Sequence, residues 1–287
     1  MSWQPLLKCL PGLLKRVRLL PRLPTTHSVT RSRIVTSRLM FTVLLLLSCN
    51  SQAKQLINYL GEARALDDAD TVLYREEHQL WQQQDQQTGQ WQPLSRQVNY
   101  YSADGELIAQ KRNEYPGLAS QPDFILMDFR QPYKEEAKRT DKGLRLTLSE
   151  NGDVSSDIVS DSDYPLVVDA GFDDFIRANW ASLLAGDTVP FSFASAARQS
   201  SVNFELQAQN PDAANNEPLK LTMTLNSALL SWLLDPIELE YHRQTQQLLR
   251  YRGISNIPDA NGDGQQVDIR YQYFDNNSAS VNTKATD

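Results

Sequence analysis

One acidic loop has the spacing with which calcium loops begin. Oxygen-bearing side chains stand at Asp259, Asn261 and Asp263, and Gly264 follows at the position where such loops turn sharply. The twelfth position, where a bidentate glutamate would complete the coordination sphere, is Arg270. The segment also continues into an alternating strand and not into a helix. The pattern therefore favours a hairpin loop over a calcium site.

Two groups of glutamate and histidine raise the question of another metal site. They are Glu76, Glu77 and His78 on one predicted strand, and Glu238, Glu240 and His242 on another. The second group occupies the strand face opposite its apolar residues, and that face meets water. We therefore interpret both groups as wet strand surfaces, and we predict no metal ion or other cofactor.

The sequence carries no pattern typical of nucleophilic catalysis or nucleotide binding. It has no Gly-x-Ser-x-Gly segment and no phosphate-binding glycine loop. After residue 53, only His78 and His242 could serve as a general base, and the two cysteines, Cys9 and Cys49, both precede that point. These observations predict a protein that is not an enzyme and has no catalytic residues.

The charges are distributed unevenly along the chain. The formal net charge is −7, but residues 1–53 contain eight Lys or Arg and no acidic residue. The remaining chain holds 20 basic and 35 acidic residues, a net charge of −15. A domain this acidic repels phosphate backbones, so nucleic acid is not an expected partner.

The N-terminal part resembles an export signal. Residues 41–47 form the most apolar run of the chain, too short to span a bilayer but typical of a signal-peptide core. Arg31, Arg33 and Arg38 precede it, and small residues before and at Ala53 suit cleavage there. We expect residues 40–53 to be the signal core and cleavage region. Residues 1–39 are a leader extension that a start site placed too early would explain.

A second cleavage site competes with the first. Leu46-Leu47-Ser48-Cys49 resembles a lipobox, in which the signal is cut before the cysteine and Cys49 is lipidated. The two sites imply different locations, the periplasm for plain cleavage and the outer membrane for a lipoprotein. In the second case, the lipid on Cys49 would be the protein's only membrane attachment.

The mature chain alternates apolar and polar residues in many short segments, as half-buried antiparallel strands do. The clearest are Leu144–Leu148, Val202–Ala208, Leu219–Leu225, Ile237–Tyr241 and Val267–Tyr271. Asp104-Gly105 and Asn151-Gly152 are dipeptides that favour two-residue hairpin turns. No alternation of strands and helices appears, so a parallel sheet is disfavoured.

One amphipathic helix is expected near residues 172–185. Its apolar positions are Phe172, Phe175, Ile176, Trp180, Leu183 and Leu184, and Gly186 ends it. A shorter helical or irregular piece is expected at residues 227–234, and residues 275–287 read as a disordered tail. We therefore predict that residues 54–274 form a single, mostly β domain of the α+β class. Its large curved antiparallel sheet, or half-barrel, packs on one main helix.

This order of elements resembles periplasmic proteins of Gram-negative bacteria and is similar in outline to the lipoprotein-carrier fold. The resemblance covers roughly residues 62–274 and depends on the layout, not on a diagnostic motif. It implies a strongly curved sheet wrapped around a helix. No functional residue carries over, and the arginine on the concave face of that family has no identifiable counterpart in the sequence.

Two functions follow from this layout. The first is a non-enzymatic binding or carrier module for an apolar small molecule or lipid-like ligand. Its cavity would be lined by Phe172, Phe175, Trp180, Phe204 and Met223. The second is an envelope scaffold or protein-interaction module with a filled core, whose partners are other envelope proteins.

The two cleavage sites predict different behaviour of the variant Cys49→Ser. A lipoprotein would lose its lipid attachment and fractionate differently, whereas a protein cut after Ala53 would be unaffected. Fractionation of the envelope, with the mass of the processed chain, distinguishes these outcomes. A natural protein that stays soluble in the cytoplasm and retains residues 41–53 would contradict the export prediction.

Overall fold

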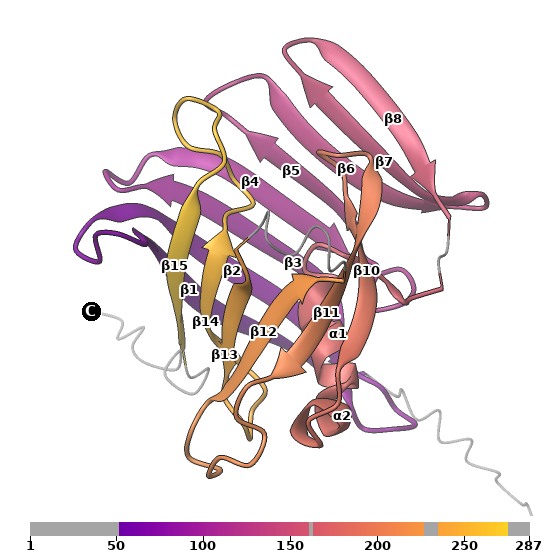
Figure 1. Ribbon diagram of the computed structural model, residues 1–287. Coiled ribbons are helices and arrows are strands. Elements are labelled where there is room, and N and C mark those ends of the chain that lie inside the picture. The colour runs from indigo at the N-terminus through magenta and orange to yellow at the C-terminus, as the bar shows by residue number, and fades with distance from the viewer. Residues whose placement is uncertain (1–51, 161–162, 227–234, 275–287) are drawn as a thin grey trace, which may run out of the picture. The chain divides into compact units, whose positions relative to one another are not determined.

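The computed structural model describes residues 52–160, 163–226 and 235–274 (Figure 1). These residues belong to one compact unit, Asn50–Asp287. Cys49, most of the predicted signal, the piece at 227–234 and the tail at 275–287 lie outside the described residues. None of the described helices is both long enough and apolar enough to cross a membrane.

Fifteen strands and two short helices make up the described part of the chain. The strands are β1 (Lys54–Ala65), β2 (Val72–Gln84), β3 (Trp91–Ser102), β4 (Leu107–Glu114), β5 (Asp123–Asp128), β6 (Tyr133–Thr140), β7 (Gly143–Glu150), β8 (Asp153–Val159), β9 (Leu166–Val168), β10 (Val189–Ser195), β11 (Ser200–Ala208), β12 (Leu219–Leu225), β13 (Ile237–Tyr241), β14 (Leu248–Ile254) and β15 (Gln266–Tyr273). The helices are α1 (Gly171–Ala178) and α2 (Trp180–Leu184). The five strands that the sequence predicts most clearly are all present, as parts of β7, β11, β12, β13 and β15.

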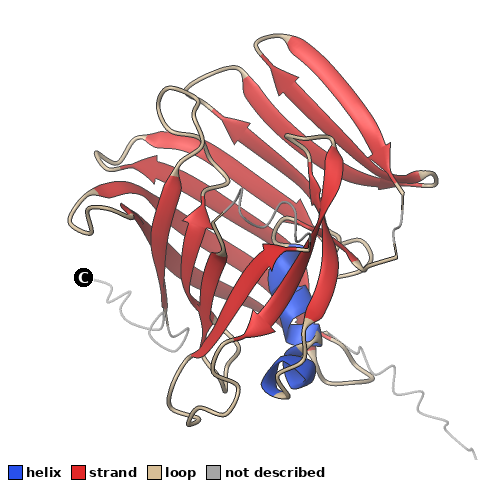
Figure 2. Cartoon of the chain, viewed as in Figure 1, coloured by secondary structure: helices blue, strands red, loops and turns tan. Residues whose placement is uncertain are grey.

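All fifteen strands lie in one sheet, with two arms that meet at β1 and β15. The N-terminal arm runs from β1 outward to β8, and the C-terminal arm runs from β15 outward to β9. The neighbouring strands of both arms pair antiparallel, except β9 and β10. Figure 2 shows both helices on one side of this sheet, between the arms. The sheet remains open, with β8 and β9 as its edges, although Gln199 next to β11 donates a hydrogen bond of 2.5 Å to Ser155 of β8.

The predicted mostly β class is confirmed, with one correction to the strand directions. β9 pairs with β10 in parallel, joined through α1 and α2, so the chain does contain one strand–helix–strand crossover. β9 is only three residues long, and Leu166, Val167 and Val168 are all buried. A run this short and this buried shows no alternation, which is why the sequence pattern gave no sign of it.

The single predicted helix is divided into α1 and α2 at Asn179. The side-chain amide of Asn179 donates a hydrogen bond of 2.8 Å to the carbonyl of Phe175. Such a bond competes with the helical backbone pattern, and the backbone at Asn179 departs from helical geometry with φ −104° and ψ 16°. Gly186, with φ +83°, follows α2 where the sequence placed the helix end.

One of the two predicted hairpin turns differs in length. Asn151 and Gly152 both have positive φ and connect β7 to β8 as a two-residue turn, as expected. At Asp104-Gly105, only Gly105 has positive φ. The amide of Ser102 donates a hydrogen bond to the carbonyl of Glu106, and three residues lie between the two. The second turn is therefore a three-residue loop.

The apolar core has two clusters. One cluster lies mainly on the N-terminal arm and includes Val98, Leu126 and Leu146. The other surrounds the helices and includes Ile176, Leu183, Phe191, Leu206, Leu219 and Leu239. A polar group of side chains joins the strands of the N-terminal arm to α1.

Gly171, at the start of α1, packs directly against the backbone of Ser120. A Cβ at this position would lie 2.4 Å from the Ser120 carbonyl carbon and oxygen. We expect Gly171→Ala to lower the free energy of unfolding by about 1–3 kcal/mol, as overpacking does. Gly117→Ala is the matched control, because a Cβ there meets nothing within 4 Å. Equal stability of the two variants in denaturant unfolding would contradict the close contact.

Candidate functional site

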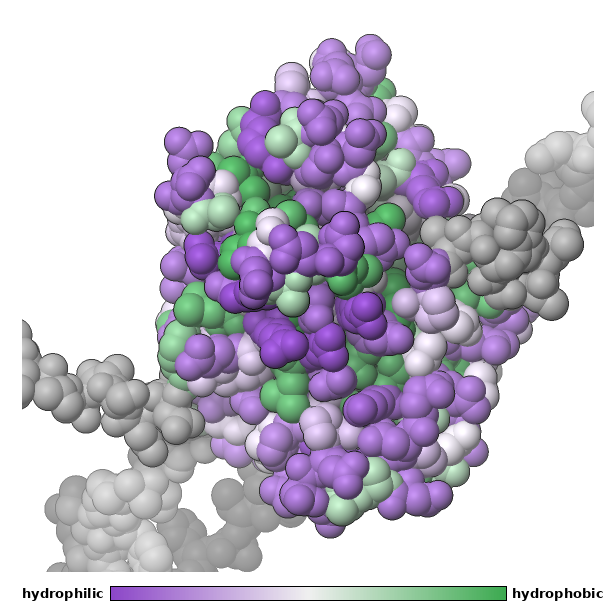
Figure 3. Space-filling view, turned by 60° about the vertical axis from the view of Figure 1, so that its left-hand side comes forward, coloured by the Kyte–Doolittle hydropathy of each residue, from purple (hydrophilic) through white to green (hydrophobic). Residues whose placement is uncertain are grey.

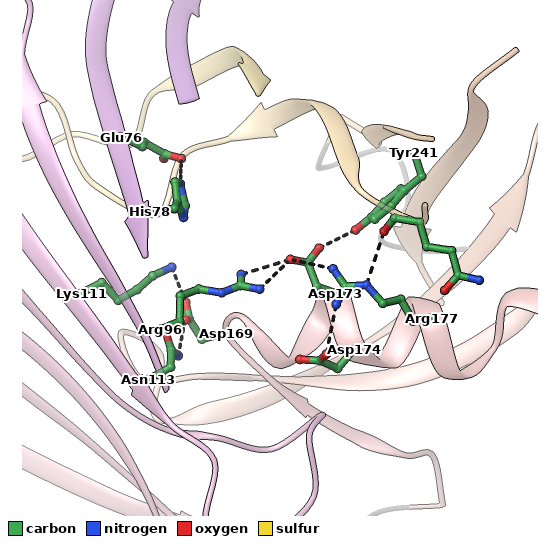
Figure 4. Close-up of polar contacts among 11 residues, drawn as sticks. Glu76, His78, Arg96, Lys111, Asn113, Asp169, Asp173, Asp174, Arg177 and Tyr241 are labelled. Carbon is green, nitrogen blue, oxygen red and sulfur yellow. Dashed lines mark hydrogen bonds and ion pairs between the residues drawn. The ribbon is translucent and has the colours of Figure 1, made fainter. Parts of the chain in front are cut away.

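Ten polar residues lie together on the inner side of the sheet and form what we call the buried polar layer, although Asp169, Asp174 and Arg177 are only half-buried (Figure 4). Its members are Glu76, His78, Arg96, Lys111, Asn113, Asp169, Asp173, Asp174, Arg177 and Tyr241. β2, β3 and β4 supply the first five. The turn before α1, α1 itself and β13 supply the others. The layer therefore joins the N-terminal arm, the helix and the C-terminal arm.

Asp173 is the residue through which both arms hold the helix. Two guanidinium nitrogens of Arg96 on β3 each donate to its Oδ2 at 3.1 Å, and the hydroxyl of Tyr241 on β13 donates to its Oδ1 at 2.7 Å. Burial alone would raise the pKa of Asp173, but the charges of Arg96 and Arg177 and the Tyr241 hydroxyl hold it below its ordinary value. Asp173 is therefore an ionised carboxylate with both oxygens engaged.

Asp169, in the turn between β9 and α1, makes the second attachment. Lys111 Nζ lies 3.0 Å from its Oδ1, and the Asn113 amide donates to its Oδ2 at 2.8 Å, both from β4. Burial would raise the pKa of Asp169, but Lys111 and Asn113 keep it lowered. Its φ of +41° is unfavourable for a residue with a side chain, so these contacts hold a strained turn in place.

Asp174 and Arg177 form a further pair within α1. Arg177 Nη1 lies 3.0 Å from Asp174 Oδ1. Burial raises the pKa of Asp174 to about 6, even though Arg177 and Arg96 act in the opposite direction. Its carboxyl group therefore titrates close to neutral pH.

Glu76 and His78 correct the expectation of a wet strand surface. They are buried, with 3% and 8% of their surface exposed, and the imidazole Nε2 lies 2.8 Å from Glu76 Oε2. The His78 ring stacks on Tyr59 at 4.2 Å between centroids. Gly61 leaves room for this pair, since a Cβ there would lie 2.9 Å from the Glu76 carboxylate. Of the first predicted group, only Glu77 is exposed.

The second predicted group lies on a more exposed surface and is used in local pairs. Glu238 and Glu240 each lie 3.4 Å from an arginine of β14, Arg252 and Arg250. The Nδ1 of His242 accepts the backbone amides of the following turn. No group of three or more potential metal ligands occurs among the residues that the structure describes.

The predicted hairpin loop at Asp259 uses its carboxylate internally. Asp259 Oδ1 accepts the backbone amides of Asn261 and Asp263 at 2.8 and 2.9 Å. These bonds lower its pKa. Its oxygen therefore satisfies the loop backbone, which is the role expected of an aspartate in such a turn.

Several buried polar atoms have no hydrogen-bond partner among the described residues. Five of them lie in or beside the buried polar layer: His78 Nδ1, Arg96 Nε, Asn113 Oδ1, Asp174 Oδ2 and Tyr115 Oη. Unpaired buried groups of this kind commonly bind ordered water. The layer therefore has capacity for internal water.

The five predicted cavity-lining residues belong to the apolar cluster around the helices. Phe175, Trp180 and Met223 are buried in it, and Phe172 and Phe204 pack against it half-buried. The ring of Phe191 on β10 contacts all three phenylalanines of this group. The ring of Tyr241 on β13 contacts Trp180. The structure thus brings the five together as a packed group. That they line a cavity stays a prediction.

Described residues also line two pockets elsewhere in the domain, and none of these five residues lines either. One, of about 1240 Å³, is an open hollow between the β4–β5 and β6–β7 loops and the segment before β9. The other, of about 610 Å³, lies on β1, β2, β3 and β15 and includes Leu60, Arg75 and Arg270. Charged and polar side chains contribute to both. Figure 3 shows an outer surface with the same mixture of hydrophilic and apolar groups.

The comparisons with known proteins give no family. No protein-family model matches the chain, and no curated protein matches it. Among solved structures, the chain is similar to a β-barrel-like protein of a domain of unknown function from Brucella abortus. The two share 9% identity over 77% of this chain and 98% of that chain, with a TM-score of 0.34. This likeness does not single out the lipoprotein-carrier fold, and it identifies no function.

The buried ion pair predicts a large effect of single substitutions. Asp173→Asn should lower the free energy of unfolding by about 3–5 kcal/mol, because Arg96 would remain charged without its partner. The double variant Arg96→Met, Asp173→Leu should lose less than the sum of Arg96→Met alone and Asp173→Leu alone, since it removes both charges. Arg112→Ala, in the exposed pair with Glu114, is the control, with a change of less than about 0.5 kcal/mol. Additive effects in a double-mutant cycle would show that Arg96 and Asp173 are not coupled.

His78 predicts a specific pH dependence of stability. Burial lowers its pKa, with partial compensation by Glu76, so the folded state keeps the ring neutral while the unfolded chain takes up a proton near pH 6.5. Stability should therefore fall as the pH decreases below about 6.5. Asp174 acts in the opposite direction between about pH 6 and 4, because the folded state binds its proton first.

The two contributions can be separated by melting temperatures measured between pH 7.5 and 5. His78→Gln should flatten the acid-side loss, and Asp174→Asn should steepen it. If His78→Gln steepened the loss of stability at acid pH, or Asp174→Asn flattened it, the side chain concerned would not be buried as described.

Proposed function

We propose that the protein is a non-enzymatic scaffold or interaction module of the bacterial envelope, whose interior is filled by its own helices. The observation that carries the proposal is the attachment of Asp173 to both arms of the sheet, through Arg96 and Tyr241. A ligand occupying the interior would have to displace α1. Removing one partner from a buried ion pair typically costs about 3–5 kcal/mol.

The composition of the interior also favours this function over a lipid carrier. Arg96 and Lys111 lie within the concave side, each 10% exposed or less. An acyl chain placed beside them would have to replace their carboxylate partners, and apolar contact does not compensate the desolvation of a charge. The apolar residues that could serve such a ligand are already packed against the helices.

Export belongs to the same proposal. The amide of Gln84 donates a hydrogen bond of 2.9 Å to the carbonyl of Ala53. Cleavage before Cys49 would keep this bond in the mature protein, whereas cleavage after Ala53 would remove it. This contact supports the lipoprotein alternative, with the outer membrane as location, beside the periplasmic one.

Native mass spectrometry of the processed protein, purified from its own envelope, tests the proposal. The expected result is the mass of the processed chain, with or without a lipid on Cys49, and no co-purifying small molecule. Crosslinking in intact cells should then recover other envelope proteins. A stoichiometric apolar ligand that is released when Trp180 is replaced by alanine would support the carrier function instead.

A further inference from the structure

The free end of the β2–β3 hairpin exposes two tryptophan side chains. Trp81 is 44% exposed and Trp91 is 38% exposed. They lie within the final residue pairs of the hairpin, where Trp81 is opposite Ser95 and Gln84 is opposite Trp91. We call residues 81–95 the hairpin tip. The register places the two side chains on opposite faces of the hairpin, so only an environment that surrounds its end would cover both.

The hairpin tip is nearly free of charge, unlike the rest of this acidic domain. Asp85 is the only charged residue between Gln79 and Ser95, and the other polar residues are mostly glutamine. The carboxylate of Asp85 accepts bonds from Gln87 and Thr88 within the turn. A negatively charged surface would therefore meet little repulsion at this place.

The loops at the opposite end of the same strands are rich in acidic residues. The antiparallel registers place the loops after β1, β3 and β14 at the end away from the hairpin tip. Those loops contain Asp67, Asp68, Asp70, Asp104, Glu106, Asp259 and Asp263. Exposed apolar residues occur there too, Leu107 at 43% and Phe129 at 51%, but they stand among carboxylates. These three loops are thus more acidic than the hairpin tip, although another loop at the tip's end of the sheet, between β11 and β12, also carries Asp212 and Glu217.

The chain enters the sheet beside the hairpin tip. Lys54 is opposite Gln83, and Ala53 is bonded to Gln84. Cys49 is four residues before Ala53, a distance of at most about 14 Å along an extended chain. A lipid on Cys49 would therefore hold the tip close to the bilayer. Cleavage after Ala53 would instead place a positive amino terminus and Lys54 beside the tip, which favours anionic headgroups.

We propose that the hairpin tip is a membrane-contact site that inserts Trp81 and Trp91 into the headgroup region of a phospholipid bilayer. Tryptophan is enriched at membrane–water interfaces because its ring is apolar and its indole N–H can bond to headgroups or water. The contact would orient the acidic loops at the other end of the strands away from the membrane. This site is independent of whether the sheet interior is filled.

Fluorescence quenching in vesicles tests this proposal with the processed protein. The vesicles contain phosphatidylethanolamine and phosphatidylglycerol, with part of the phosphatidylethanolamine brominated on its acyl chains. We expect a blue shift and quenching of the tryptophan emission in the natural protein. Both proteins carry W232F, because Trp232 lies outside the described residues. In this background the variant W81F/W91F should lose most of the quenching, because the remaining Trp180 is buried in the core.

The control is L107Q/F129Q, which alters exposed apolar residues at the acidic end and should leave the quenching unchanged. Melting temperatures of both variants establish that they fold. The proposal is wrong if the natural protein shows no quenching, or if W81F/W91F retains all of it. It is also wrong if the two tryptophans stay unquenched in vesicles but become shielded from acrylamide in envelope preparations, since the tip then docks on a protein.

Discussion

The carboxylate of Asp173 holds the architecture together. A fifteen-stranded meander can curve or flatten with little change to its ladders, because each strand contacts mainly its neighbours. The arms also contact each other directly, as Tyr74 and Ser255 do through a hydrogen bond of 2.8 Å, and the helix that both arms hold adds a further constraint on their relation. Asp173 receives Arg96 from one arm and Tyr241 from the other, and Asp169 attaches the turn before that helix to β4.

This arrangement explains why charged groups are kept inside a domain that also has two apolar clusters. A purely apolar helix could slide or rotate against the sheet with similar burial. Bonds directed at both carboxylate oxygens specify one position, which is a recognised use of buried polar groups. A fixed interior suits a protein that works through its outer surface, and the exposed, nearly uncharged hairpin tip then becomes the more informative functional feature.

The sequence predicted what depends on local periodicity. Val202–Ala208 and Ile237–Tyr241 alternate clearly and form strands, and Gly186 follows the helices. The buried polar layer could not be predicted in this way, because Arg96 lies 77 residues from Asp173, and Tyr241 lies 68 residues from it. Glu76 and His78 were predicted to lie on a wet surface, and only their alternation with Tyr74 and Leu80 on one face could have indicated that they point inward. β9 is too short for any period.

Native-state hydrogen exchange of the α1 amides tests directly whether the interior is permanently filled. If Asp173 locks the helix to both arms, the amides of Phe175 to Ala178 should exchange only through global unfolding. They should then show the same free energy and the same dependence on denaturant as the amides of β1 and β2. Exchange of α1 through a low-energy local opening, while those strands remain protected, would contradict the account and identify the helix as a movable cover over a binding cavity.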